Sequence, residues 1–124
     1  MTIAATGAMI HEALKAREML IKKLGKKAPS IEIVAVSSIK KFDTTLINSI
    51  KKTRRVITVE DHNSLSGLGG QLARKLAEIS IQVKSFKMIA PEKYQLSGTA
   101  DELYHAAKID AEAIAKVCYN LHKN

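Results

Sequence analysis

Short apolar runs and helical patterns alternate four times along this chain, and this alternation limits the folds that are available to it. The apolar runs, which we predict to be strands, cover residues 2–6, 31–36, 56–59 and 81–88. A segment with apolar residues at helical spacing follows each run. Parallel strands that are joined by helices form a sheet with both faces covered.

We therefore predict an α/β fold, a three-layer α/β/α sandwich with a mainly parallel sheet. Right-handed crossovers leave few possible strand orders. The order 2-1-3-4 is the simplest one that places the first and third strands at the centre. The 124 residues contain no internal repeat and no long linker, so we predict that residues 1–124 form a single domain.

Capping signals mark the ends of several predicted helices. Asp43 and Asp110 are suitable N-caps for the segments that follow them, and Thr99 with Glu102 has the spacing of a capping box. Gly25 is expected to end a helix over residues 8–24. The apolar face of that helix is predicted to contain Ile10, Ala13, Leu14, Leu20, Ile21 and Leu24.

Residues 54–70 place polar groups where an open α/β sheet binds ligands. The β-branched run ends at Val59, and the polar residues 60–63 follow directly. The glycine-rich residues 66–70 then begin a helix, whose first backbone N–H groups attract anions. In the order 2-1-3-4 this loop borders the switch point beside the end of the first strand. We predict a candidate anion- or ligand-binding site at Thr6, Gly7, His62, Ser66, Gly67 and Gly69.

A structural role is the competing interpretation of these small residues, because they also let a helix pack closely against a sheet. The segment is not a P-loop, since no Lys-Ser/Thr pair follows the glycines. Glu60 and Asp61 are adjacent at a strand end, so their side chains diverge and do not form a paired-carboxylate site. No His/Cys cluster has zinc spacing, and we predict no catalytic residue and no metal ligand in this chain.

The chain is strongly basic, with a formal net charge of +8. Most lysine clusters fall at predicted helix ends and no aromatic residues are interleaved with them, so we expect a solvated basic face and no nucleic-acid partner. No apolar run approaches the roughly 20 residues of a membrane span, and we expect no membrane partner. One cysteine, Cys118, and no recognisable signal peptide predict a cytoplasmic location.

Three groups of residues, taken together, resemble one known domain. They are residues 2–7 (TIAATG) with 11–14 (HEAL), residues 59–62 (VEDH) before the glycines, and Ser97-Gly98 with Glu102-Leu103 and Ile109-Asp110. In this order, over nearly the whole chain, they are similar to the C-terminal domain of transketolase. Tyr94 also fits the family pattern, whereas Lys41 and Ile89 replace the usual proline and glycine. Deoxyxylulose-phosphate synthases and the β subunits of 2-oxo acid dehydrogenases share the domain and remain alternative parents.

This resemblance implies a part of an enzyme that transfers a ketol unit between sugar phosphates of the pentose phosphate pathway. Such enzymes use thiamine diphosphate and Mg²⁺, which other domains hold through a Gly-Asp-Gly segment and an activating glutamate. Neither feature is in this sequence, so we expect a structural, dimer-supporting domain that is inactive alone and has no cofactor of its own. Its expected partners are the remaining transketolase domains or subunit. The alternative is a free-standing flavodoxin-like module that binds an anion or a nucleotide.

The resemblance also implies a fifth, antiparallel strand upstream of the residues that match at Thr2. Without that strand, residues 31–36 become an open edge of the sheet. This segment is apolar, carries one charge at Glu32 and contains no proline. Unpaired N–H and C=O groups at such an edge recruit other chains. We expect the edge to be covered, in the isolated chain by a second copy in a homodimer.

Overall fold

The computed structural model describes residues 1–93 and 97–124 and contains a parallel four-stranded sheet. Its strands are β1 (Thr2–Ala5), β2 (Glu32–Ala35), β3 (Arg55–Val59) and β4 (Ser85–Ile89). They are arranged in the order β2-β1-β3-β4, and every neighbouring pair is parallel. The predicted α/β fold and strand order are therefore confirmed. Tyr94 lies outside the described residues.

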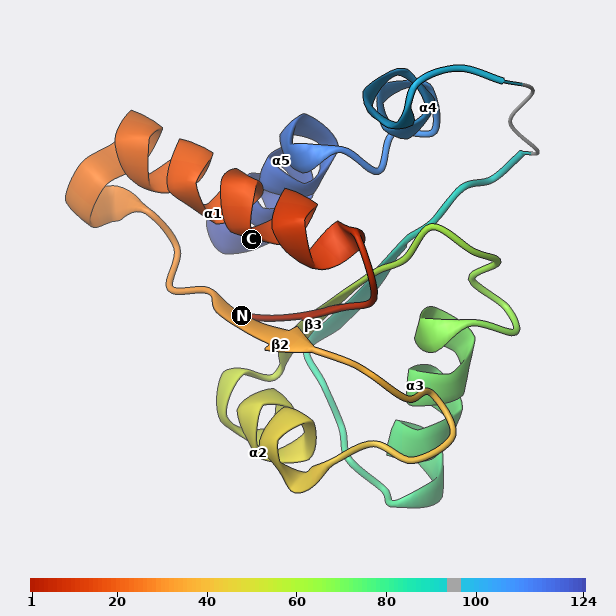
Figure 1. The fold of residues 1–124 in the computed structure, drawn as a ribbon. Coiled ribbons are helices and arrows are strands. Elements are labelled where there is room, and N and C mark those ends of the chain that lie inside the picture. Colours follow the sequence, from red (N-terminus) through yellow and green to blue (C-terminus); the bar gives the residue numbers. More distant parts are fainter. Residues whose placement is uncertain (94–96) are drawn as a thin grey trace.

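Helices cover both faces of the sheet (Figure 1). Helices α1 (Met9–Leu24) and α5 (Ala111–Lys123) lie on one face, and the short helix α4 (Ala100–Ala106) precedes α5. Helices α2 (Thr44–Thr53) and α3 (Leu68–Glu78) lie on the other face. A single 3-10 turn, η1 (Gly25–Lys27), follows α1. Within the described residues, no helix has the length and apolar character that crossing a membrane requires.

Alternating residues of the central strands divide the core into two clusters, because successive strand side chains point to opposite faces. Ile3 and Ile57 pack with Ile114 and other residues of α1 and α5. Ala4 and Val56 pack with Leu72 and other residues of α2 and α3. Both β1 and β3 are almost completely buried, which explains why their sequences are continuous apolar runs.

The predicted helix caps are present. Leu46 N donates to the Asp43 carboxylate at 2.9 Å, and Ala113 N donates to Asp110 at 3.0 Å. Thr99 and Glu102 form a complete capping box at the start of α4. These contacts are local in the sequence, so residue type and spacing were sufficient to predict them.

Two local predictions were wrong. On α1, Leu14 and Ile21 are 36% and 52% exposed, because the helix packs through a narrow stripe that includes Ala13 and Ala16. The fourth strand begins at Ser85, four residues later than predicted. Ile81 N instead donates to the carbonyl of Leu76 at the end of α3, and Lys84 N donates to the carbonyl of Arg54 just before β4 begins.

Candidate functional site

Glu60 is the first residue of the loop that connects β3 to α3, and its side chain holds the start of α3. Glu60 is only 2% exposed, and both of its carboxylate oxygens accept backbone hydrogen bonds from the first turn of α3. Leu68 N donates to Oε2 at 2.7 Å, and Gly69 N donates to Oε1 at 2.9 Å. A helix N-terminus stabilises negative charge, and here the anion is a side chain of the same chain.

Further backbone hydrogen bonds close the loop around this carboxylate. Gly67 N donates to the carbonyl of Asn63 at 2.8 Å, and Gly70 N donates to that of Ser64 at 2.7 Å. The side chain of Asn63 accepts from Leu65 N at 2.7 Å. The amides of Gly67 and Gly69, which belong to the predicted anion site, therefore already have partners within the chain.

Two glycines of this loop, Gly67 and Gly70, are required because neighbouring atoms approach their backbone too closely for a side chain. A Cβ atom on Gly67 would lie 1.9 Å from Glu60 Oε2 and 2.4 Å from the carbonyl oxygen of Asn63. A Cβ atom on Gly70 would lie 2.0 Å from the carbonyl oxygen of Leu65. Real Cβ atoms do not approach other atoms so closely, so these contacts favour the structural interpretation of the small residues.

The remaining predicted site residues lie around this loop. Thr6 N donates to the carbonyl of Val59 at 3.2 Å, which places the ends of β1 and β3 side by side. Gly7 has a φ of 53° and makes the turn into α1. Ser66 is exposed, and the exposed His62 lies 3.6 Å from the carboxylate of Asp61, measured between Nδ1 and Oδ1.

A second buried glutamate performs the same task for α5. Glu12, on α1, is 7% exposed, and its Oε2 accepts from Ala111 N at 2.9 Å. Its other oxygen pairs with Lys15 at 3.0 Å. Our sequence interpretation missed both capping glutamates. For Glu60, an acid shortly before a glycine-rich helix start is a usable signal, whereas Glu12 and Ala111 are 99 residues apart.

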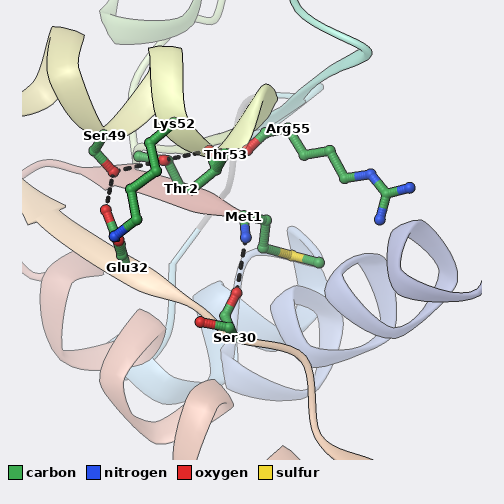
Figure 2. Close-up of polar contacts among 8 residues, drawn as sticks. All are labelled: Met1, Thr2, Ser30, Glu32, Ser49, Lys52, Thr53 and Arg55. Atoms are coloured by element: carbon green, nitrogen blue, oxygen red, sulfur yellow. Dashed lines mark hydrogen bonds and ion pairs between the residues drawn. The ribbon is translucent and has the colours of Figure 1, made fainter.

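A hydroxyl network lies at the opposite, amino-terminal edge of the sheet (Figure 2). The buried Thr2 hydroxyl lies 2.7 Å from that of Ser49 and 2.8 Å from that of Thr53. Ser49 in turn donates to Glu32 at 2.6 Å, and Lys52 forms an ion pair with the same carboxylate. The Lys52 ammonium and the Ser49 hydroxyl lower the pKa of Glu32. The network joins β1, β2 and α2.

One group of side chains in the described part of the chain has the mutual spacing of metal ligands, namely His105, Asp110 and Glu112. Asp110 accepts from Ala113 N through one oxygen, and its other oxygen lies 2.7 Å from His105 Nδ1. This contact raises the pKa of His105. Asp110 and Glu112 lie at the start of α5, where the helix dipole opposes a cation, and His105 lies in the last turn of α4, so a capping role explains the group.

Cys118 is a core residue and not a reactive thiol. It is fully buried on the inner side of α5. Burial raises the pKa of its thiol to about 12, which keeps it protonated at neutral pH.

Comparison with known proteins gives consistent matches. The profile of the family "Transketolase, C-terminal domain" matches residues 1–114. The chain is 40% identical over 116 residues to a putative transketolase C-terminal section of Methanocaldococcus jannaschii, covering 94% of this chain and 35% of that protein. It is 31% identical over 122 residues to one of the subunits of an apulose-4-phosphate transketolase from Actinobacillus succinogenes, covering 97% of this chain and 38% of that protein.

The fold matches a solved structure that is described as a split gene transketolase, inactive beta4 tetramer. The TM-score is 0.83 at 24% identity, over 98% of this chain and 39% of that one. The chain thus spans little more than a third of the length of these three relatives. Pyruvate dehydrogenase E1 β subunits and 1-deoxy-D-xylulose-5-phosphate synthases contain the same domain.

Proposed function

Because this chain belongs to the transketolase C-terminal domain family, we propose that it is the structural, dimer-supporting domain of a transketolase-like enzyme. The proposed reaction of the complete enzyme is the transfer of a ketol unit between sugar phosphates, as in the pentose phosphate pathway. We place this enzyme in the cytoplasm as part of the same proposal. The family match over residues 1–114 carries this proposal. The relatives named transketolase, one of them a subunit, support it over the pyruvate dehydrogenase and deoxyxylulose-phosphate synthase alternatives.

We further propose that thiamine diphosphate and Mg²⁺ are bound by other domains or by a partner subunit. The loop that begins at Glu60 does not fit that cofactor. A diphosphate at the start of α3 needs unpaired N–H donors there, but Leu68 N and Gly69 N donate to Glu60. In the described ranges, the group of side chains with metal-ligand spacing lies at the start of α5, far in sequence from that loop. We therefore assign this chain no residue that contacts the reacting atoms.

The occupied loop also weakens the alternative of a free-standing anion- or nucleotide-binding module. An external anion at Leu68 N and Gly69 N would compete with the Glu60 carboxylate, and at Gly67 N it would compete with the carbonyl of Asn63. The Glu60 carboxylate accepts two hydrogen bonds and is tethered to the same chain, so its effective concentration at the amides of Leu68 and Gly69 is very high. A structural domain needs no such ligand.

The open edge at β2 is the proposed assembly surface. Glu32 N and Val36 N donate inward, to the carbonyls of Met1 and Ala5, at 2.9 Å each. Since N–H groups alternate along a strand, those of Ile33 and Ala35 point outward from the sheet. We propose that a second copy of the chain covers this edge in a homodimer, or that an upstream segment covers it in the complete enzyme.

Reconstitution tests the proposed function. The chain is mixed with the thiamine-binding polypeptide of the same organism, and ketol transfer from a ketose phosphate to an aldose phosphate is measured. We expect activity from the mixture, and none from this chain alone. Full activity of the other polypeptide without this chain would contradict the proposal. Decarboxylation of pyruvate, in place of ketol transfer, would instead assign the chain to one of the related enzymes.

Light scattering on the isolated chain tests the assembly surface. Ala35→Pro removes an outward N–H while leaving the inward hydrogen bonds of β2 in place, because proline is tolerated at sheet edges. We expect a dimer for the wild type, a monomer for Ala35→Pro and a dimer for the matched control Ala35→Ser. Equal dimerisation of the proline variant would show that β2 is not the contact.

A further inference from the structure

A cationic groove lies on the face of the molecule that carries α2 and α3. The connector between β2 and α2 swings across to α3 before it turns back (Figure 1). Between this connector and α3 is a cavity of about 260 Å³. Its polar lining consists of Lys40 and Lys41 from the connector and Gln71, Arg74, Lys75 and Glu78 from α3.

The charges of this groove are poorly compensated. Glu78 is its one carboxylate, and it is shared by two cations, Arg74 at 3.0 Å and Lys75 at 4.0 Å. Within residues 1–93 and 97–124, the side chains of Lys40 and Lys41 form no ion pair and no hydrogen bond. Like charges that face one concave space repel each other and raise the local concentration of anions.

The shape of the groove selects a compact anion. Its cations come from two walls, Lys40 and Lys41 from the connector and Arg74 and Lys75 from α3, and the space between these walls is small. An Arg guanidinium and Lys ammonium groups are the usual partners of phosphate oxygens, and the Gln71 amide adds a further donor. The nonpolar floor contains Ile39 and Phe42, which are half-buried against the core. Phe42 is thus no exposed platform for stacking the bases of a polynucleotide.

We propose that this groove binds the phosphoryl group of a small phosphate ester. The site is separate from the Glu60 loop, requires no metal and involves no covalent step. It does not depend on the proposed function, because its charges and shape belong to this chain alone.

Chemical-shift titration of the ¹⁵N-labelled chain at constant ionic strength tests the proposal. Inorganic phosphate and ribose 5-phosphate are the probes, with sodium chloride as the ionic control. We expect saturable shifts in residues 39–42 and 71–78 with both phosphate probes and none with chloride. Tighter binding of the ester would identify a metabolite as the ligand, and equal binding would identify free phosphate.

A matched pair of double variants tests the groove residues themselves. Lys40→Gln/Lys41→Gln should weaken phosphate binding by about tenfold, since it removes half of the converging cations. Lys26→Gln/Lys27→Gln removes the same charge from an exposed turn outside the groove and should change the affinity less than about twofold. Arg74→Gln tests the other wall independently and should also weaken binding.

Several outcomes would overturn the proposal. Equal losses in both double variants would show that binding follows net charge alone. Chemical-shift changes of the same size with sodium chloride would also show that binding follows net charge alone. Tighter binding of a polyglutamate peptide or a single-stranded oligonucleotide at these residues would show that the groove serves a macromolecule. The spectra of all variants should retain the wild-type dispersion, which separates loss of binding from loss of folding.

Discussion

At the two ends of the parallel sheet, a glutamate is held in opposite ways. Glu60, at the carboxyl edge, is 2% exposed and accepts hydrogen bonds from two backbone amides. Glu32, at the amino edge, has a side chain that is 35% exposed, and side chains of α2 hold it. The first arrangement is fixed by the backbone, whereas the second depends on rotatable groups that water can replace.

The comparison shows that the amides at the start of α3 already have an anionic partner within the chain. The helix dipole and the first amides of α3 favour an anion, as the sequence suggested. Glu60 supplies that anion from within the chain, so the charge that would attract a ligand is already neutralised. At the amino edge, the hydroxyl network joins neighbouring elements without burying a charge fully (Figure 2).

The largest expected effect is that of Glu60→Ala. It leaves the buried N–H groups of Leu68 and Gly69 without partners, which should lower the free energy of unfolding by about 3 kcal/mol. Urea unfolding monitored by circular dichroism measures the loss. The exposed Glu18→Ala is the control and should change stability by less than about 0.5 kcal/mol. Equal stability of the two variants would show that Glu60 is not a structural cap.

The same variant tests the predicted anion site at residues 66–69. With the carboxylate removed, sulfate should bind at the amides of α3 and stabilise Glu60→Ala by about 1 kcal/mol at roughly five times its Kd. Wild-type protein should gain much less under the same conditions. Thermal unfolding in sulfate and in chloride of equal ionic strength measures the difference. Equal gains for both proteins would argue against an anion position at this helix.

At the amino edge, Thr2→Val should have a smaller effect. It removes the hydroxyl that contacts Ser49 and Thr53 while preserving the shape of the side chain. The remaining hydroxyls keep other partners, Glu32 and the carbonyl of Arg55, so the expected loss is about 1 kcal/mol. A loss as large as that of Glu60→Ala would remove the contrast between the two edges.

The smallest effect concerns the pH dependence that Glu32 confers. Its folded pKa lies below the ordinary value of 4.5, mainly because of Lys52 and then Ser49. The resulting stabilisation is complete above pH 4.5 and is lost as the pH falls through the folded pKa. Carboxyl NMR titration should show the pKa of Glu32 rising towards 4.5 in Lys52→Ala. An unchanged pKa in that variant would mean that the ion pair does not hold the carboxylate.

Local sequence patterns predicted most of the fold. Apolar runs identified the strands, and Asp43, Thr99 and Asp110 marked helix starts, because a cap contacts backbone only three residues away. The predictions that failed concern contacts between elements. Leu14 and Ile21 satisfy the helical period, yet the rotation of α1 is set by how closely Ala13 and Ala16 approach their neighbours.

For the candidate site, the sequence by itself determined that α3 begins at the carboxyl edge with glycines and with an anion preference. Only the tertiary structure decided which anion satisfies that preference. The loop of residues 61–67 turns so that the first amide of α3 reaches the Glu60 carboxylate. Glu12 contacts Ala111, which lies 99 positions away in the sequence. A residue pattern indicates that a helix N-terminus favours a negative charge nearby. The partner that supplies this charge depends on distances in space, which short-range spacing does not contain.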